Sequence, residues 1–212
     1  MQPDARQFAP STARNREPIL GVLQRVLPRG ARILEIASGA GEHAVYFAAA
    51  SPGWTWTPSD PDAGARASIA AWIAAAALDN VEQPRDIDAQ SSAWGVEDEA
   101  PYDAIVSINM VHISPWRSAL GLMAGAWRLL GAGGKLILYG PFKREGRHTA
   151  PSNEAFEGWL KQRSPDYGVR DLADIEAAAA AEALVLAEIV DMPANNFMLV
   201  FERAGAKKPT GV

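Results

Sequence analysis

The 212-residue sequence predicts an α/β fold in which helices cover both faces of a mostly parallel sheet. Three observations indicate this class. Short apolar runs alternate with segments of helical period along most of the chain. A glycine-rich turn, residues 37–41, joins the first apolar run to a helix. The last two runs are separated by a short link, which predicts an antiparallel hairpin.

The N-terminal half is expected to contribute three helices and three strands. Each strand is a short apolar, β-branched or aromatic run, and each helix has apolar residues at turn spacing. Pro28 and Gly30 end the first helix. In chain order the expected elements are helix 17–27, strand 33–36, helix 42–50, strand 54–57, helix 62–77 and strand 80–89.

The C-terminal half is expected to add three helices and four strands, which gives a seven-stranded sheet. Pro115 is suited to the first turn of the fourth helix, and the glycines from Gly131 onward end it. Ser152 is expected to cap the fifth helix. The expected elements are strand 102–109, helix 116–130, strand 135–139, helix 153–163, helix 171–183, strand 184–190 and strand 196–203.

The length fits one domain with a sizeable core, which we expect over residues 1–203. Residues 1–18 are polar and rich in proline, so they form either a solvated arm or a lid over a ligand cleft. Residues 204–212 are expected to be a disordered tail.

Composition limits the classes of partner. The chain has no cysteine, which excludes disulfides and thiolate metal sites, and we expect no metal. A net charge of −5 argues against non-specific binding of nucleic acid. No apolar run approaches a membrane span, and the first residues lack a secretory h-region. We expect a cytoplasmic protein with a small-molecule substrate and neither nucleic-acid nor membrane partners; the oligomeric state is not predicted.

The glycine turn is compatible with two cofactors. Gly39 and Gly41 satisfy a dinucleotide fingerprint, and they nearly satisfy the glycine motif of class I S-adenosylmethionine (SAM) methyltransferases. Glu35 favours SAM, because a carboxylate that ends a buried strand needs a partner such as the ammonium group of SAM. The first glycine of the methyltransferase motif is Ala37 here. The expected cofactor residues of the turn are Glu35, Ala37, Ser38, Gly39 and Gly41.

Acidic residues follow the next two expected strands. Asp60 ends the second strand, where a carboxylate can accept hydrogen bonds from both ribose hydroxyls; alternatively, Ser59 or Asp60 caps the following helix. Asp88 is expected to contact the adenine amino group. Trp94 is either an adenine-stacking wall or ordinary packing.

Polar residues at later strand ends are candidates for binding and catalysis. Asn109 is expected to contact the methionine part of SAM or the acceptor, and Tyr139 to orient the acceptor. His112 is a candidate base, although it is as readily a histidine with a structural function. Methyl transfer mainly requires alignment of acceptor, methyl carbon and sulfur, and a base only where the acceptor must lose a proton.

Further candidates for acceptor binding lie outside the strands. Asn15 and Arg16 are in the N-terminal arm, where Arg16 could grip a carboxylate or phosphate if the arm closes. Asn153 lies in the long polar segment 143–171 that follows the fifth strand, at the start of the expected helix 153–163.

Several segments, taken together and in order, resemble the methyltransferase-like 26 family, which has the class I SAM-dependent methyltransferase fold. The resemblance covers the chain from about Ala9 to Arg203, and it implies that SAM is bound and converted to S-adenosylhomocysteine (SAH). Ala37 belongs to this family's version of the turn. The segments are residues 14–20, 34–44, 58–60, 108–116, 139–142, 152–153 and 193–196.

The sequence therefore predicts a SAM-dependent methyltransferase acting on a small polar acceptor that it does not identify. Two alternatives remain open. A nicotinamide-dependent reductase would share the glycine turn and Asp60, but it explains Glu35 and the hairpin poorly. A protein that binds SAM without transferase activity would keep the cofactor pocket and lack an acceptor site.

Overall fold

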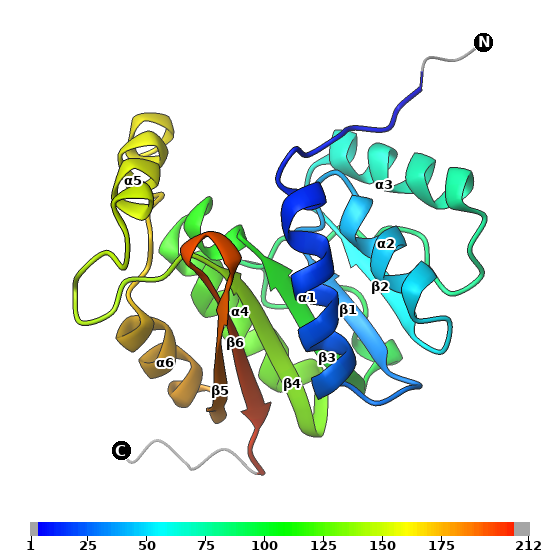
Figure 1. Cartoon of the computed structure of the whole chain (residues 1–212). Coiled ribbons are helices and arrows are strands. Elements are labelled where there is room, and N and C mark those ends of the chain that lie inside the picture. The colour runs from blue at the N-terminus through cyan, green and yellow to red at the C-terminus, as the bar shows by residue number, and fades with distance from the viewer. Residues whose placement is uncertain (1–3, 206–212) are drawn as a thin grey trace.

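The computed structural model describes residues 4–205 and contains one six-stranded sheet with helices on both faces (Figure 1). The strand order is β2-β1-β3-β4-β6-β5. The strands are β1 (Arg32–Ile36), β2 (Thr55–Ser59), β3 (Tyr102–Ile108), β4 (Leu130–Gly140), β5 (Leu184–Met192) and β6 (Asn196–Arg203). The first three residues of the expected arm and residues 206–212 of the expected tail lie outside the described residues.

The order of the strands reverses beside β1. Strands β1 to β4 are parallel, whereas β6 runs antiparallel to both β4 and β5, so the predicted hairpin is confirmed. The chain passes from β1 outward to β2 and then returns to β3 on the other side of β1. Open α/β sheets bind ligands at the carboxyl ends of the strands where the chain reverses in this way.

One of the seven predicted strands, over residues 80–89, is not formed as a continuous strand. This segment lies beside β2, but it makes only two isolated parallel bridges, between Trp56 and Val81 and between Ser59 and Arg85. Pro84 stands between the two bridges and has no N–H group to donate, so the ladder is interrupted there. The segment therefore occupies the position of an edge strand without forming a continuous one.

Two hydrophobic cores lie on opposite faces of the sheet. Helices α1 (Thr12–Val26), α2 (Glu42–Ala50) and α3 (Ala63–Ala76) pack on one face, and α4 (Trp116–Leu129) and α6 (Leu172–Ala181) on the other. Helix α5 (Pro151–Arg163) stands apart, beyond the carboxyl ends of the parallel strands (Figure 1). Three short 3-10 turns are η1 (Glu97–Glu99), η2 (Met110–His112) and η3 (Pro193–Asn195). Within residues 4–205, no helix combines the length and apolar character needed to cross a bilayer.

Helix α1 begins at Thr12, five residues before the position that the sequence predicted. Pro18 lies in the interior of the helix, although proline is unfavourable there. The fully buried side chains of Ile19 and Leu23 anchor the helix to the sheet. Consequently, Asn15 and Arg16 are held on a packed helix and not on a free arm.

Candidate functional site

The glycine turn forms one wall of a small hollow at the carboxyl end of β1. This hollow, which we call the loop hollow, has a volume of about 150 Å³ and includes Glu35. Gly41 has φ +92°, and a Cβ atom there would lie 2.8 Å from the Cα of Ile69 on α3. Ala37 also has a left-handed backbone, with φ 60°. The turn is therefore held in a tight shape in which Gly41 packs closely against α3, as glycine permits.

Glu35 is an acid buried without a basic partner among the described residues. Its side chain is 1% exposed, and Trp56 Nε1 donates a hydrogen bond of 3.0 Å to its Oε2 atom. Burial raises the pKa of Glu35 from 4.5 to about 7, although hydrogen bonds from Trp56 and Ser38 oppose the rise. A cation delivered to the loop hollow would relieve this cost, which is the property expected of a site for an ammonium group.

Asp60 lies beside the same turn and is free of any helix-capping role. Its Oδ2 accepts a 3.0 Å hydrogen bond from the N–H of Gly39, and its Oδ1 accepts one of 3.0 Å from Asp62. Asp62, not Ser59 or Asp60, caps α3, by accepting from the N–H of Ala65 at 2.7 Å. A carboxylate has about four acceptor positions, so Asp60 retains capacity for a diol.

The residues expected to contact adenine are not brought to the loop hollow. Asp88 is exposed, and its Oδ1 accepts a 2.9 Å hydrogen bond from the N–H of Gln90. Trp94 is 4% exposed and packs in the core, against α4 at Gly125. Trp94 is therefore an ordinary core residue, because its indole ring is covered by protein.

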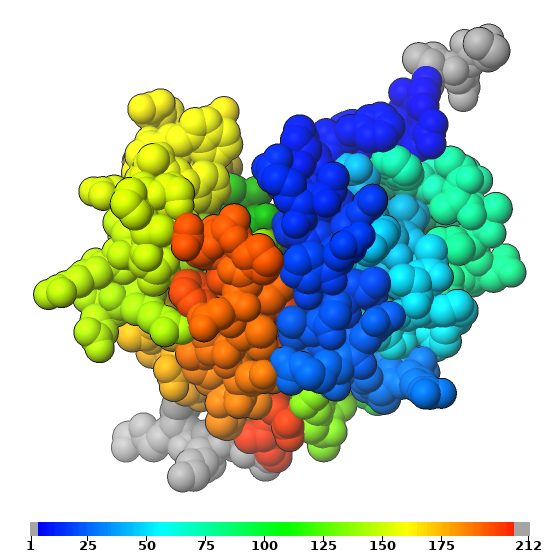
Figure 2. Space-filling model, viewed as in Figure 1, coloured from blue at the N-terminus to red at the C-terminus, as the bar shows by residue number. Residues whose placement is uncertain are grey.

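A second and larger hollow, the helix hollow, lies between α1 and α5 and has a volume of about 740 Å³. Figure 2 shows the depression between these two surfaces. The two hollows share Ser11, Asn109 and Ile113, so they meet at the end of β3. The helix hollow is lined by Ser11, Arg14, Asn15, Asn109, Ile113, Tyr139, Pro141, Ser152, Asn153, Phe156, Trp159, Pro193, Ala194, Asn195 and Asn196.

Four predicted site residues meet in the helix hollow: Asn15, Asn109, Tyr139 and Asn153. Asn109 has a left-handed backbone, φ 64°, which directs the chain sharply away after β3. Asn15 interacts with the Tyr139 hydroxyl, and its Oδ1 lies 2.8 Å from Nε2 of His43. This buried chain of contacts joins α1, α2 and β4 beneath the point where the two hollows meet.

His112 lines neither hollow. Its side chain is fully buried, its Nδ1 accepts a 3.4 Å hydrogen bond from the N–H of Arg170, and its ring lies edge-on to Phe142. Burial lowers the pKa of His112 to about 3, so the imidazole is neutral near pH 7 and weakly basic. The placement corresponds to the structural alternative for this histidine.

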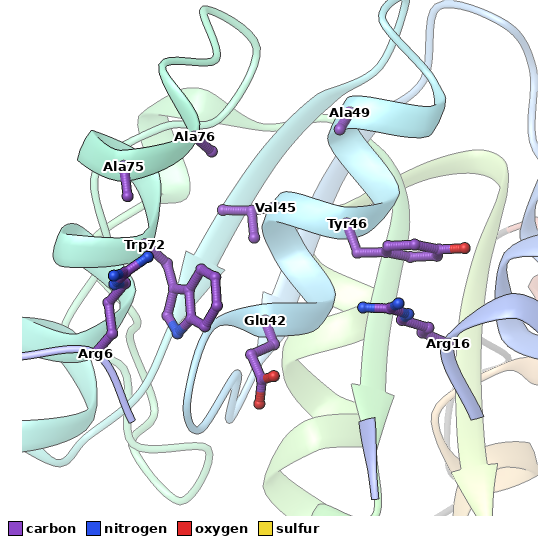
Figure 3. Close-up of a pocket in the computed structure, with 9 residues that line it drawn as sticks. All are labelled: Arg6, Arg16, Glu42, Val45, Tyr46, Ala49, Trp72, Ala75 and Ala76. Carbon is purple, nitrogen blue, oxygen red and sulfur yellow. The ribbon is translucent and has the colours of Figure 1, made fainter. Parts of the chain in front are cut away.

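Arg16 also lies outside both hollows. Its guanidinium stacks on the Tyr46 ring, with 4.4 Å from Cζ to the ring centre, in a separate outer pocket between α2 and α3 (Figure 3). Arg14, one half-turn earlier on α1, lines the helix hollow instead.

Sequence reasoning missed several lining residues of the helix hollow. Phe156 and Trp159 have a helical spacing of three, and their rings are stacked with centroids 5.7 Å apart. That spacing on a largely polar helix was a usable signal for an exposed aromatic face. Asn195 and Asn196 lie at the hairpin tip, and their approach to α5 depends on tertiary packing that local sequence does not report.

The fold agrees with that of known methyltransferases. A structure of the S-adenosylmethionine-dependent methyltransferase SibL superposes with a TM-score of 0.76 at 20% identity, covering 92% of this chain and 56% of that chain. An O-methyltransferase family protein from Burkholderia thailandensis gives 0.76 at 16% identity, covering 90% and 56%. A Galdieria sulphuraria protein, named as a candidate sarcosine dimethylglycine methyltransferase, gives 0.70 at 14% identity, covering 94% and 92%. The chain thus spans little more than half the length of the first two.

The chain has the Rossmann-like fold seen in class I SAM-dependent methyltransferases. The order of the strands, the C-terminal hairpin and these superpositions indicate it, and the sheet has six strands. Residues 6–203 match the family described as "Protein of unknown function (DUF938)". The match covers most of the chain, which therefore belongs to this family.

Proposed function

We propose that the protein is a SAM-dependent methyltransferase that acts on a small-molecule acceptor. The observation that carries the proposal is Glu35, an acid buried at the end of β1 with no basic partner in the described chain, in a hollow that opens into a larger one. A ligand with a cationic end in the loop hollow and its reactive group toward the helix hollow would use both features.

In this proposal Glu35 and the turn at the loop hollow, and Asp60 beside the turn, have separate functions. Glu35 holds the ammonium end of SAM, the N–H groups of the turn contact its carboxylate, and Asp60 accepts from the ribose hydroxyls. Bound SAM supplies an electrophilic methyl group whose leaving group is a neutral thioether, SAH. Asn109 and Tyr139 orient the acceptor at the junction, because both border the helix hollow at strand ends.

His112 is then a positioning residue. Its backbone carbonyl accepts from the N–H of Gly168, and its ring packs where a Cβ on Gly140 would lie 2.5 Å from Nε2. It therefore fixes the loop after β3 against residues on both sides of α5, and so sets the position of Asn109.

Two further points support the proposal. Solved structures with the same fold are named as methyltransferases, including CalO1, whose structure contains SAH. The motif resemblance to the methyltransferase-like 26 family also covers the turn with alanine at position 37. The reductase alternative leaves Glu35 without a partner.

The test is a thermal-shift comparison of SAM, SAH and NADPH, followed by transfer of labelled methyl from SAM in cell extracts. A ligand at one hundred times its dissociation constant adds about 2.7 kcal/mol of stability, which is readily measured. We expect stabilisation by SAM and SAH only, and a labelled product. Stabilisation by NADPH alone would refute the proposal, and binding without any labelled product would favour a non-catalytic SAM-binding protein.

A further inference from the structure

The walls of the helix hollow restrict the class of acceptor. We infer that the acceptor is a hydroxylated aromatic compound with an anionic group, methylated on an acidic phenolic or enolic oxygen; the inference rests on the proposed methyl transfer. Four features of the described residues support it, and each concerns a different part of the molecule that would be bound.

One wall of the helix hollow is aromatic. Phe156 and Trp159 project from α5, whose buried side chains are only Asn153 and Leu160, and Trp159 remains 45% exposed. Arg163 covers the Trp159 ring, with its Cζ 3.2 Å from the ring centre. A planar, apolar body would bury the exposed part of this wall and gain stacking energy that a small aliphatic compound would not.

Two of the amides that line the helix hollow, Asn153 and Asn196, have their nitrogen atoms engaged by the protein. The Nδ2 group of Asn153 donates to Thr149 Oγ1 at 3.1 Å and to the carbonyl of Asn195 at 2.9 Å. The Nδ2 group of Asn196 donates to the carbonyls of Pro193 and Ala194. Because these carbonyls can only accept, the orientation of both amides is fixed, and each Oδ1 is left to accept from a ligand hydroxyl.

The charged lining of the helix hollow has one sign. Of its lining residues within the described chain, Arg14 alone carries a formal charge, and no carboxylate is among them. No hydrogen bond or ion pair is recorded between the Arg14 guanidinium and another described residue. A cationic acceptor would meet this guanidinium without a compensating acid, whereas a carboxylate on the acceptor could pair with it.

The junction of the two hollows lacks a strong base. It is formed by Ser11, Asn109 and Ile113, with Tyr139 nearby, and burial raises the pKa of Tyr139 so that its hydroxyl stays protonated. An acceptor oxygen must therefore be acidic enough to lose its proton to water. That oxygen then bonds to the methyl carbon as the carbon–sulfur bond breaks, and the electron pair of that bond stays on sulfur.

Three naphthols that differ in one substituent test the inference. The SAH-saturated protein is titrated with 6-hydroxy-2-naphthoate, 6-hydroxy-2-naphthamide and 6-(aminomethyl)-2-naphthol, and binding is followed by naphthol fluorescence. We expect the carboxylate to bind most tightly and the amine most weakly. With SAM in place of SAH, mass spectrometry should find the methyl ether of the naphthoate and not its methyl ester.

Variants of neighbouring residues provide matched controls. Arg14→Gln should weaken binding of the naphthoate about fivefold, which corresponds to the loss of an exposed ion pair. It should leave binding of the naphthamide unchanged. Arg16→Gln removes the same charge from the same helix outside the helix hollow, and it should change neither. Trp159→Ala, at an exposed position, should weaken both compounds about tenfold.

The inference fails if the amine binds most tightly, if no naphthol binds, or if Arg14→Gln and Arg16→Gln behave alike. The titrations are repeated without SAH. If the protein does not bind SAH, the proposed function is contradicted. The naphthol titrations without SAH then still test binding in the helix hollow.

Discussion

Replacing Glu35 by Gln tests whether the buried acid is reserved for a cation. Burial raises the pKa of Glu35 from 4.5 to about 7, a difference of about 2.5 pH units. Since each unit corresponds to about 1.4 kcal/mol, ionised Glu35 costs the unliganded folded protein about 3 kcal/mol at alkaline pH. Glutamine is similar in shape and cannot ionise, so the variant avoids this cost.

Proton linkage determines the direction in which pH changes the stability of the folded protein. A carboxyl group whose pKa is higher in the folded state contributes stability that is fully present below its unfolded pKa and is lost as the pH rises through its folded pKa. The relevant window for Glu35 is therefore from pH 4.5 to about 7. We expect the free energy of unfolding of Glu35→Gln, relative to wild type, to increase by about 3 kcal/mol between pH 4.5 and pH 8.5.

In the presence of SAM, wild type should gain more stability than Glu35→Gln. Loss of a buried ion pair costs 3 kcal/mol or more, so Glu35→Gln should bind SAM about 100-fold more weakly. Binding of SAM to wild type at pH 6 should also release a proton from Glu35, which calorimetry in two buffers of different ionisation enthalpy detects.

Urea denaturation at the two pH values provides the stability measurement. Glu42→Gln is the matched control, because Glu42 is an acid that lines the same hollow and accepts instead from the N–H of Ala9. It removes an acid from the same hollow and leaves the carboxyl group of Glu35 in place, so it gives the baseline for the comparison. If Glu35→Gln has the same pH dependence as wild type and equal affinity for SAM, the assignment of Glu35 as the ammonium site is refuted.

Three other substitutions test the site. Gly41→Ala forces a Cβ to 2.8 Å from Ile69 Cα at φ +92°, so urea denaturation should show a loss of about 2 kcal/mol, and an unchanged midpoint would contradict this. Asp60→Asn should weaken SAM about tenfold by calorimetry while circular dichroism shows full helix content; equal affinity would argue against ribose binding. Asn15→Leu leaves the buried Nε2 of His43 unpaired and should cost about 2 kcal/mol in thermal unfolding, and wild-type stability would show that the 2.8 Å contact is not needed.

Most of the fold could be predicted because strong local patterns agree with the tertiary structure. The apolar runs of β1 and β3 are buried on both faces, and the short link after β5 leaves a hairpin as the practical connection. Two differences from the predicted elements involve proline. Pro84 interrupts the expected strand 80–89, although that segment still lies beside β2, and Pro18 lies inside α1, which begins five residues earlier than predicted. Tertiary packing decides both elements, and the local pattern does not report it.

The loop hollow was more accessible to sequence reasoning than the helix hollow. Glu35, the turn and Asp60 are close in sequence to the strands that position them, so motif spacing sufficed. The helix hollow instead joins α1, α5 and the hairpin tip, which are distant in the chain. Arg14 and Arg16 illustrate the limit, because only the rotation of α1 on the sheet decides which of them faces the helix hollow.

A co-crystal structure with SAH tests the central claim most directly. We expect the ammonium group of SAH within hydrogen-bonding distance of Glu35, the ribose at Asp60, and the sulfur directed toward Asn109 at the junction of the two hollows. Density for SAH at another location, or a sulfur closed off from the helix hollow, would contradict it.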